Sequence, residues 1–97
     1  MRIVTHKAIV QFYKNHNDAT TALETWYKKT IDANWTCFAD LKKSFNAVDS
    51  VGNKRYVFNI KGNDYRLIVK INYDYGLIWI RFIGTHKQYD KINAETI

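Results

Sequence analysis

The sequence predicts an α+β domain in which an antiparallel sheet is covered on one face by N-terminal helices and is followed by a short C-terminal helix. Apolar residues recur at helical spacing through the first half of the chain, whereas three later segments are rich in β-branched and aromatic residues and are separated by turn residues. The 97 residues contain no proline and no low-complexity linker. We therefore expect a single domain over residues 1–97, large enough to bury one hydrophobic core.

The first half of the chain is expected to form one short strand and several helices. The expected ranges are 2–5 for the strand and about 6–16, 18–31 and 38–45 for the helices. Thr5 is the expected N-cap of the first helix, and Asn17 or Asp18 that of the second, because their side-chain oxygens can accept hydrogen bonds from the first free N–H groups of a helix. The apolar stripes of these helices are expected to pack in the core.

The second half is expected to form an antiparallel sheet with two tight turns. The expected strands are 54–60, 65–72 and 77–83. The Gly-Asn pair at 62–63 suits the first turn, and the second is expected within residues 73–76. These turns set Asn59 opposite Arg66 in the first hairpin and Ile68 opposite Arg81 in the second.

Alternation along these strands separates an apolar face from a basic face. The apolar face carries Tyr56, Phe58, Ile60, Tyr65, Leu67, Val69, Ile71, Ile78, Ile80 and Phe82. The basic face carries Arg55, Val57, Asn59, Arg66, Ile68, Lys70, Trp79 and Arg81, with no carboxylate. Because like charges on neighbouring strands repel, this face is predicted to bind an anion such as phosphate.

The overall charge and the cysteine content limit the kind of partner and compartment. A net charge of +6 favours nucleic acid, an acidic protein or an anionic membrane as partner. The apolar runs are too short to span a bilayer and the N-terminus lacks the apolar region of a signal peptide, so we expect no membrane partner. The single cysteine, Cys37, cannot form an internal disulfide, which suits the reducing cytoplasm. Its neighbours Trp35 and Phe38 predict a buried thiol rather than a nucleophile.

The segment after the last strand carries a dense set of reactive side chains. Gly84 is expected to end the strand, and His86, Lys87, Tyr89, Asp90 and Lys91 follow it. RNA cleavage without a metal needs such groups, because a 2′-hydroxyl loses a proton, the leaving 5′-oxygen gains one, and cations stabilise the phosphate. The histidines lack the spacing of zinc ligands, so we expect no metal and no organic cofactor. The alternative interpretation is a solvated helix start with Thr85 as its N-cap.

Several of these segments together resemble the HigB family of bacterial toxins, a part of the RelE/ParE superfamily. The similarity is strongest in Tyr56-Val-Phe-Asn-Ile, Tyr65-Arg-Leu, Ile80-Arg-Phe-Ile-Gly-Thr-His and Tyr89-Asp-Lys-Ile. The resemblance implies a RelE-like fold and the toxin of a type II toxin–antitoxin system, an mRNA interferase that cleaves mRNA at the ribosomal A site. It also implies a neighbouring HigA-like antitoxin with a helix-turn-helix, which holds the toxin inactive. The family's His-x-x-Tyr-Asp segment matches His86, Tyr89 and Asp90, and its sheet arginines match Arg66 and Arg81.

The resemblance and the basic face together give a candidate site. The candidate catalytic residues are Arg66, Arg81, His86, Tyr89, Asp90 and Lys91. Arg66 and Arg81 are expected to bind the scissile phosphate; Asp90 or His86 would be the general base, and the other, or Tyr89, the general acid. The candidate RNA-binding residues are Arg55, Asn59, Lys61, Asn63, Lys70, Trp79 and Lys87. The alternatives are a non-catalytic inhibitor of a protein such as DNA gyrase, as in ParE-type members, and a simple nucleic-acid-binding module.

Overall fold

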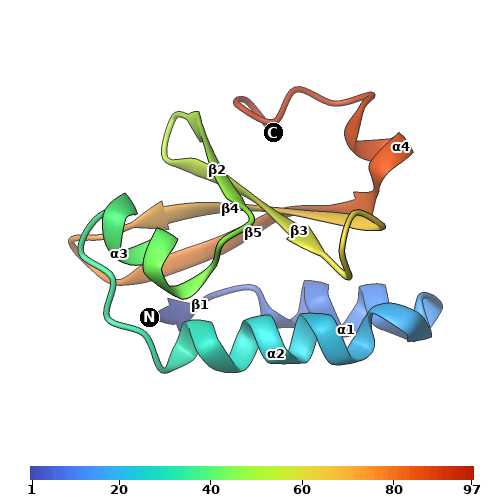
Figure 1. The fold of residues 1–97 in the computed structure, drawn as a ribbon, viewed down its shortest axis with the longest axis horizontal. Helices are drawn as coiled ribbons and strands as arrows, with labels where there is room; N and C mark the ends of the chain where they lie inside the picture. Colours follow the sequence, from blue (N-terminus) through green and yellow to red (C-terminus); the bar gives the residue numbers. More distant parts are fainter.

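A five-stranded sheet in the order β1-β5-β4-β3-β2 forms the centre of the fold in the computed structural model, which describes residues 1–97 (Figure 1). The strands are β1 (Arg2–Ile3), β2 (Val48–Gly52), β3 (Arg55–Ile60), β4 (Tyr65–Asn72) and β5 (Leu77–Thr85). Strands β2 to β5 are antiparallel, and the short β1 adds in parallel to β5. The predicted α+β class is confirmed, with a mixed sheet in place of a purely antiparallel one.

The helices lie where the sequence predicts them, on one face of the sheet and at its C-terminal end. They are α1 (His6–Asn15), α2 (Thr20–Ile31), α3 (Phe38–Ser44) and α4 (His86–Tyr89), with a 3₁₀ turn at Asn17–Ala19 before α2. Helices α1 and α2 run side by side under the sheet, while the C-terminal segment crosses the opposite face (Figure 1). None of the helices combines the length and apolar character that crossing a membrane requires.

The core lies between the helices and the predicted apolar face of the sheet. Every residue predicted on that face except Phe82 lies in the core or packs against it. Aromatic side chains meet edge to face at its centre, where the Phe58 ring lies 5.4 Å from Trp26 and 5.2 Å from Phe45. Burial of this apolar surface is the main force that holds the helices against the sheet.

Strand β2 was not predicted, because its sequence carries little strand signal. Only Val48 is buried among residues 48–52, and the other positions are polar, glycine or half-exposed. The turn to β3 uses Asn53 and Lys54 with positive φ angles of 52° and 63°. Such a turn suits a tight hairpin, so Lys54, which we expected to begin a strand, lies in the turn.

Cys37 is exposed, and the prediction of a buried thiol is wrong. Trp35 is buried and Phe38 half-buried on either side of it. Cys37 precedes the first residue of α3 in an extended conformation. Aromatic neighbours in the sequence therefore do not bury this residue.

Ala19, rather than Asn17 or Asp18, occupies the N-cap position of α2. Thr5 and Asp18, two of the side chains predicted to cap helices, instead connect the helices to the sheet. Thr5 occupies the N-cap position of α1, but its hydroxyl accepts a hydrogen bond from the Ile80 N–H at 2.7 Å. Asp18 accepts hydrogen bonds from the Tyr65 hydroxyl at 2.7 and 2.8 Å and from the Lys61 ammonium at 2.9 Å. Each side chain therefore accepts hydrogen bonds from residues of the sheet side of the fold instead of from the first N–H groups of its own helix.

The predicted pairing is confirmed for β3 with β4 but only for half of β4 with β5. Asn59 lies opposite Arg66 and Lys70 opposite Trp79, as expected. A β-bulge then inserts Arg81, so that Ile68 lies opposite Phe82 and Arg66 opposite Gly84. The predicted pairing of Ile68 with Arg81 is therefore wrong. Beyond the bulge every β5 side chain lies on the face opposite to the predicted one. Phe82 is therefore outside the core, and Ile83 packs against it.

We predict that Asp18→Asn lowers the melting temperature at neutral pH. The hydrogen bond from Tyr65, and then that from Lys61, lowers the pKa of Asp18 below its ordinary value of 3.8. A lowered pKa in the folded state contributes stability that is present above 3.8 and is lost as the pH falls through the folded-state pKa. Thermal unfolding should therefore show the largest difference between wild type and variant near pH 7 and a shrinking difference as the pH falls below 3.8. A difference that stays constant with pH would contradict this role.

Candidate active site

Helix α4 begins where the sequence predicts and is held by a capping box. The Thr85 hydroxyl accepts a hydrogen bond from the Gln88 N–H at 3.2 Å, and the Gln88 side chain accepts one from the Thr85 N–H at 2.9 Å. The His86 N–H donates to the main-chain oxygen of Asp64 at 3.3 Å. These bonds fix the start of α4 beside the turn that joins β3 and β4.

His86 and Asp90 form a side-chain pair across one turn of this segment. The His86 Nδ1 lies 3.0 Å from Asp90 Oδ2. The two side chains are 51% and 57% exposed, so the pair is open to solvent. A carboxylate at Nδ1 orients the imidazole and fixes the proton on that nitrogen, which leaves Nε2 free to accept or donate a proton.

Arg66 and Tyr89 form the inner part of the same site. Arg66 is 9% exposed, and its Nη1 donates to the main-chain oxygens of Asn63 and Tyr65 at 3.1 and 3.2 Å. Its guanidinium carbon lies 5.9 Å from the centre of the Tyr89 ring, in a cation–π arrangement. The other guanidinium nitrogens have no acceptor within the chain, so they can bind an external anion. The structure thus brings together Arg66, His86, Tyr89 and Asp90.

Gly84 makes room for this arrangement. It lies opposite Arg66 in the sheet. A Cβ atom at position 84 would lie 2.6 Å from the Phe82 ring and 2.7 Å from the Gln88 side-chain oxygen. Both contacts are far closer than packed atoms allow. Contrary to our expectation, Gly84 does not end the strand, because β5 continues to Thr85.

Arg55 and Arg81 converge on the C-terminal segment instead of facing open solvent together. The Nε atoms of Arg55 and Arg81 donate to the same main-chain oxygen, that of Ile97, at 3.0 and 3.2 Å. The Asn53 amide donates to the main-chain oxygen of Glu95 at 3.2 Å, so the turn between β2 and β3 meets the same segment (Figure 1). Residues 93–97 carried no signal in the sequence for this position, and their contact with the basic face was not predicted.

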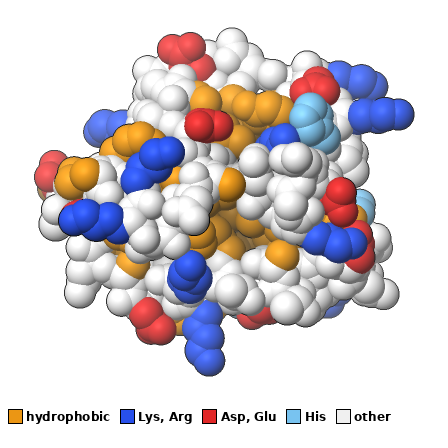
Figure 2. Space-filling model, in the orientation of Figure 1, with side chains coloured by type: hydrophobic (Ala, Val, Ile, Leu, Met, Phe, Trp, Pro, Cys, Tyr) orange, Lys and Arg blue, Asp and Glu red, His pale blue; other side chains and the backbone are white.

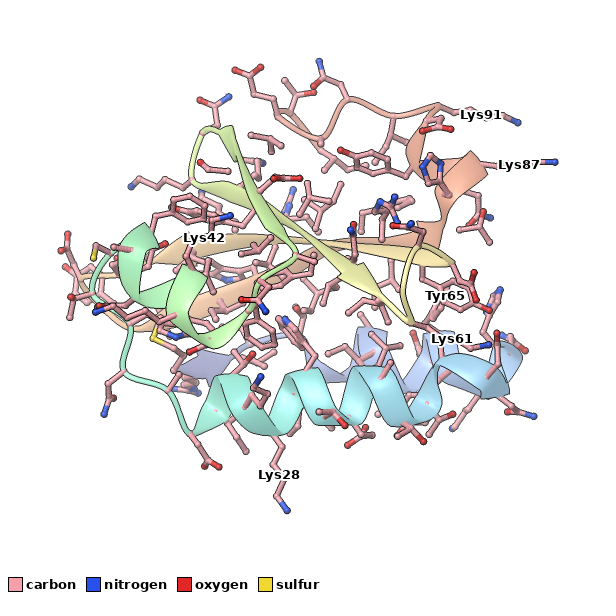
Figure 3. All side chains as sticks on the ribbon, in the orientation of Figure 1. Lys28, Lys42, Lys61, Tyr65, Lys87 and Lys91 are labelled. Atoms are coloured by element: carbon pink, nitrogen blue, oxygen red, sulfur yellow. The ribbon has the colours of Figure 1, made fainter.

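The remaining predicted residues lie at varied distances from this centre. Asn59 donates to the Asn63 side chain at 3.5 Å, opposite Arg66. Lys87 and Lys91 project outward from the C-terminal segment, whereas Lys61 lies on the helix side next to Tyr65 (Figure 3).

Lys70 and Trp79 form a separate pair farther along the sheet. The Lys70 ammonium lies 5.8 Å from the Trp79 ring. This pair is four residues along β4 from Arg66, or about 13 Å. The structure therefore does not join Lys61, Lys70 and Trp79 to the central group, and no three His, Cys, Asp or Glu side chains converge to hold a metal.

The family model of HigB toxins, described as the RelE-like toxic component of a toxin–antitoxin system, matches residues 19–92. The chain belongs to the HigB toxin family. The mRNA interferase toxin HigB of Escherichia coli K12 is 29% identical over 104 residues, which cover 97% of this chain and 92% of that protein. The mRNA interferase HigB of Shigella flexneri has the same identity and coverage, and that of Escherichia coli O6:H1 is 23% identical over 95% of this chain and 91% of its own.

The match to the HigB family covers the whole candidate site. All candidate residues, from Arg55 to Lys91, lie within the matched residues 19–92. Residues 93–97, which contact Arg55 and Arg81, lie outside them. As a HigB toxin the chain is the toxic component of a toxin–antitoxin pair, so it has an antitoxin partner.

We predict that Gly84→Ala destabilises the protein by about 1–3 kcal/mol, the usual cost of overpacking. The added methyl group would collide with the Phe82 ring and with the Gln88 side chain that caps α4. Denaturant unfolding measures the loss. The double variant Gly84→Ala/Phe82→Leu should recover part of it, because leucine lacks the ring atom that the methyl group meets. Unfolding of Gly84→Ala at the wild-type midpoint would mean that the ring and α4 move aside at no cost.

Proposed function

We propose that this HigB toxin is a ribosome-dependent endoribonuclease that cleaves mRNA by attack of a 2′-hydroxyl on the adjacent phosphate, without a metal. The relatives that match it along nearly its full length are named mRNA interferases, which supports mRNA as the substrate. The observation that carries the chemistry is the His86–Asp90 pair, whose imidazole lies 6.5 Å from the Tyr89 ring, which in turn lies 5.9 Å from the Arg66 guanidinium. The same names favour this function over a non-catalytic, ParE-like inhibitor.

His86 is proposed as the general base. Asp90 holds the His86 Nδ1 at 3.0 Å, so the Nε2 atom is the one that meets substrate. It takes the proton of the 2′-hydroxyl as the new bond to phosphorus forms. The Tyr89 hydroxyl has no hydrogen-bond partner in the chain and is proposed to give its proton to the leaving 5′-oxygen. The products are a 2′,3′-cyclic phosphate and a 5′-hydroxyl, and solvent returns the proton from His86 to Tyr89.

Arg66 is proposed to hold the scissile phosphate. Its two hydrogen bonds to main-chain oxygens keep the guanidinium in place before substrate arrives. A cation held in place before the reaction stabilises developing negative charge without the cost of reorganising it in the transition state. Lys87 and Lys91 are exposed on the same segment and are proposed to bind the flanking phosphates.

Arg81 and Arg55 are proposed to bind RNA once the C-terminal segment moves. Both now share the main-chain oxygen of Ile97, and the phosphate oxygens of RNA would give each guanidinium a charged acceptor of its own. The open position of His86 and Asp90 suggests that the ribosome, rather than a deep cleft, presents the mRNA. A HigA-like antitoxin with a helix-turn-helix is the proposed partner.

We predict that the RNA fragments carry 2′,3′-cyclic phosphate and 5′-hydroxyl ends. Attack by the 2′-hydroxyl produces these ends, whereas a metal-activated water would leave a 5′-phosphate. The measurement is end mapping of mRNA cut on purified ribosomes, with and without a chelator. Fragments with 5′-phosphates at the primary cut would refute the mechanism.

We predict that Arg66→Met, His86→Ala and Asp90→Ala each slow mRNA cleavage about a hundredfold or more, since each removes a group used in the transition state. The Met side chain keeps the aliphatic packing of Arg66 without its charge. Lys43→Ala, which removes an exposed cation from α3, is the matched control and should cleave at the wild-type rate. Single-turnover cleavage on ribosomes gives the rates, and thermal unfolding checks that each variant is folded. Wild-type rates in all three variants would show that this group is not the active site.

A further inference from the structure

A groove lies between α2 and the end of β3, on the helix side of the sheet and away from His86 and Asp90. Its volume is about 460 Å³, and its apolar wall includes Trp26, Phe45 and Phe58. Figure 2 shows hydrophobic atoms at the floor of this hollow above α2, with cationic side chains around it. The Trp26 indole N–H, buried in the wall, has no acceptor in the structure. The proposed cleavage mechanism uses none of these residues.

The edge of β3 is unpaired where it borders this groove. The Asn59 N–H donates to the main-chain oxygen of Ala47 at 3.2 Å, which is the last bond on the β2 side. Beyond it, neither the Asn59 main-chain oxygen nor the Lys61 N–H has a hydrogen-bond partner. Alternate residues of a strand direct these groups to the same side. The Asn59 main-chain oxygen and the Lys61 N–H are therefore spaced as the acceptor and the donor that an added strand requires.

The charge at the rim of the groove is positive and largely unneutralised. The Lys29 ammonium donates to the Ser44 main-chain oxygen at 2.9 Å and lies 4.6 Å from the Phe45 ring, and neither partner carries a charge. Lys61 is the exception, because it pairs with Asp18 at 2.9 Å. A segment that carries carboxylates would find complementary charge at the Lys29 end.

We infer that an extended segment of the antitoxin, with alternating apolar and acidic residues, adds as a strand to the free edge of β3 and fills this groove. The unpaired edge favours a peptide over RNA, since a strand supplies both a main-chain donor and an acceptor. The positive rim disfavours a second copy of this chain, which carries a net charge of +6. The inference rests on the toxin–antitoxin membership of the chain and is independent of the proposed cleavage chemistry.

Groove-filling and charge-reversing variants test this inference with the cognate antitoxin. Thr25→Trp places a large ring in the groove from an exposed position of α2, and Lys29→Glu reverses the charge at its rim. Each should weaken antitoxin binding at least tenfold in isothermal titration. Thr21→Trp, which does not line the groove, and Lys28→Glu, whose side chain points away from the sheet (Figure 3), are the matched controls and should bind within twofold of wild type. Unchanged affinity in both groove variants would overturn the inference.

Amide hydrogen exchange in the complex tests strand addition directly. The Lys61 N–H should exchange at least tenfold more slowly when the antitoxin is bound, because the new strand would accept its hydrogen bond. Protection confined to α4, or to the β5 edge beside α1, would place the antitoxin elsewhere and overturn the inference. So would self-association of the isolated chain through the groove, or loss of RNA binding in Lys29→Glu with antitoxin binding intact. Neither measurement needs cleavage, so failure here leaves the proposed endoribonuclease untouched.

Discussion

The β-bulge at Arg81 determines which side chains face the candidate active site. Before the bulge, β5 turns Ile78 and Ile80 toward the helices, in step with Val69 and Ile71 of β4. One extra residue reverses this alternation for the rest of the strand. Gly84 then faces the C-terminal segment, opposite Arg66. Without the bulge, the bulky Ile83 would lie opposite Arg66, and α4 would begin on the wrong side of the sheet.

The sequence allowed the first hairpin to be predicted more fully than the second, and the reason is local. The turn at residues 61–64 and an unbroken alternation fix the pairing of β3 with β4. In β5, the run Ile80-Arg-Phe-Ile carries apolar residues at both odd and even positions after Arg81. Such a run fits the core with or without an extra residue, so alternation alone cannot locate a bulge. Strand β2 escaped prediction for the opposite reason. It buries only one side chain, so its sequence shows no apolar alternation, and only its pairing with β3 makes it a strand.

The basic face was predicted from its lack of carboxylates, and the structure stabilises Arg66 and Lys70 on it without an anion. Arg66 donates to the main-chain oxygens of Asn63 and Tyr65, and Arg55 to that of Asn53. Aromatic rings lie next to Arg66 and Lys70. Neutral oxygens and ring faces offset part of the repulsion between the cations while leaving their net charge in place. The absence of carboxylates therefore did not by itself require a bound phosphate, and the phosphate-binding role of these residues stays a prediction. Their ability to bind one rests instead on the guanidinium nitrogens of Arg66 that have no acceptor in the chain.

The geometry of His86 and Asp90 depends on the sheet rather than on α4 itself. A helix of four residues is too short to persist alone, because its few hydrogen bonds do not offset the cost of ordering it. Its position comes from the Thr85–Gln88 capping box, from the bond between His86 and Asp64, and from the space left by Gly84. A motif such as His-x-x-Tyr-Asp identifies the reactive side chains in the sequence, but their placement is encoded in residues 64, 84, 85 and 88, none of which takes part in the proposed chemistry. A search of the sequence for reactive side chains alone therefore overlooks these four residues.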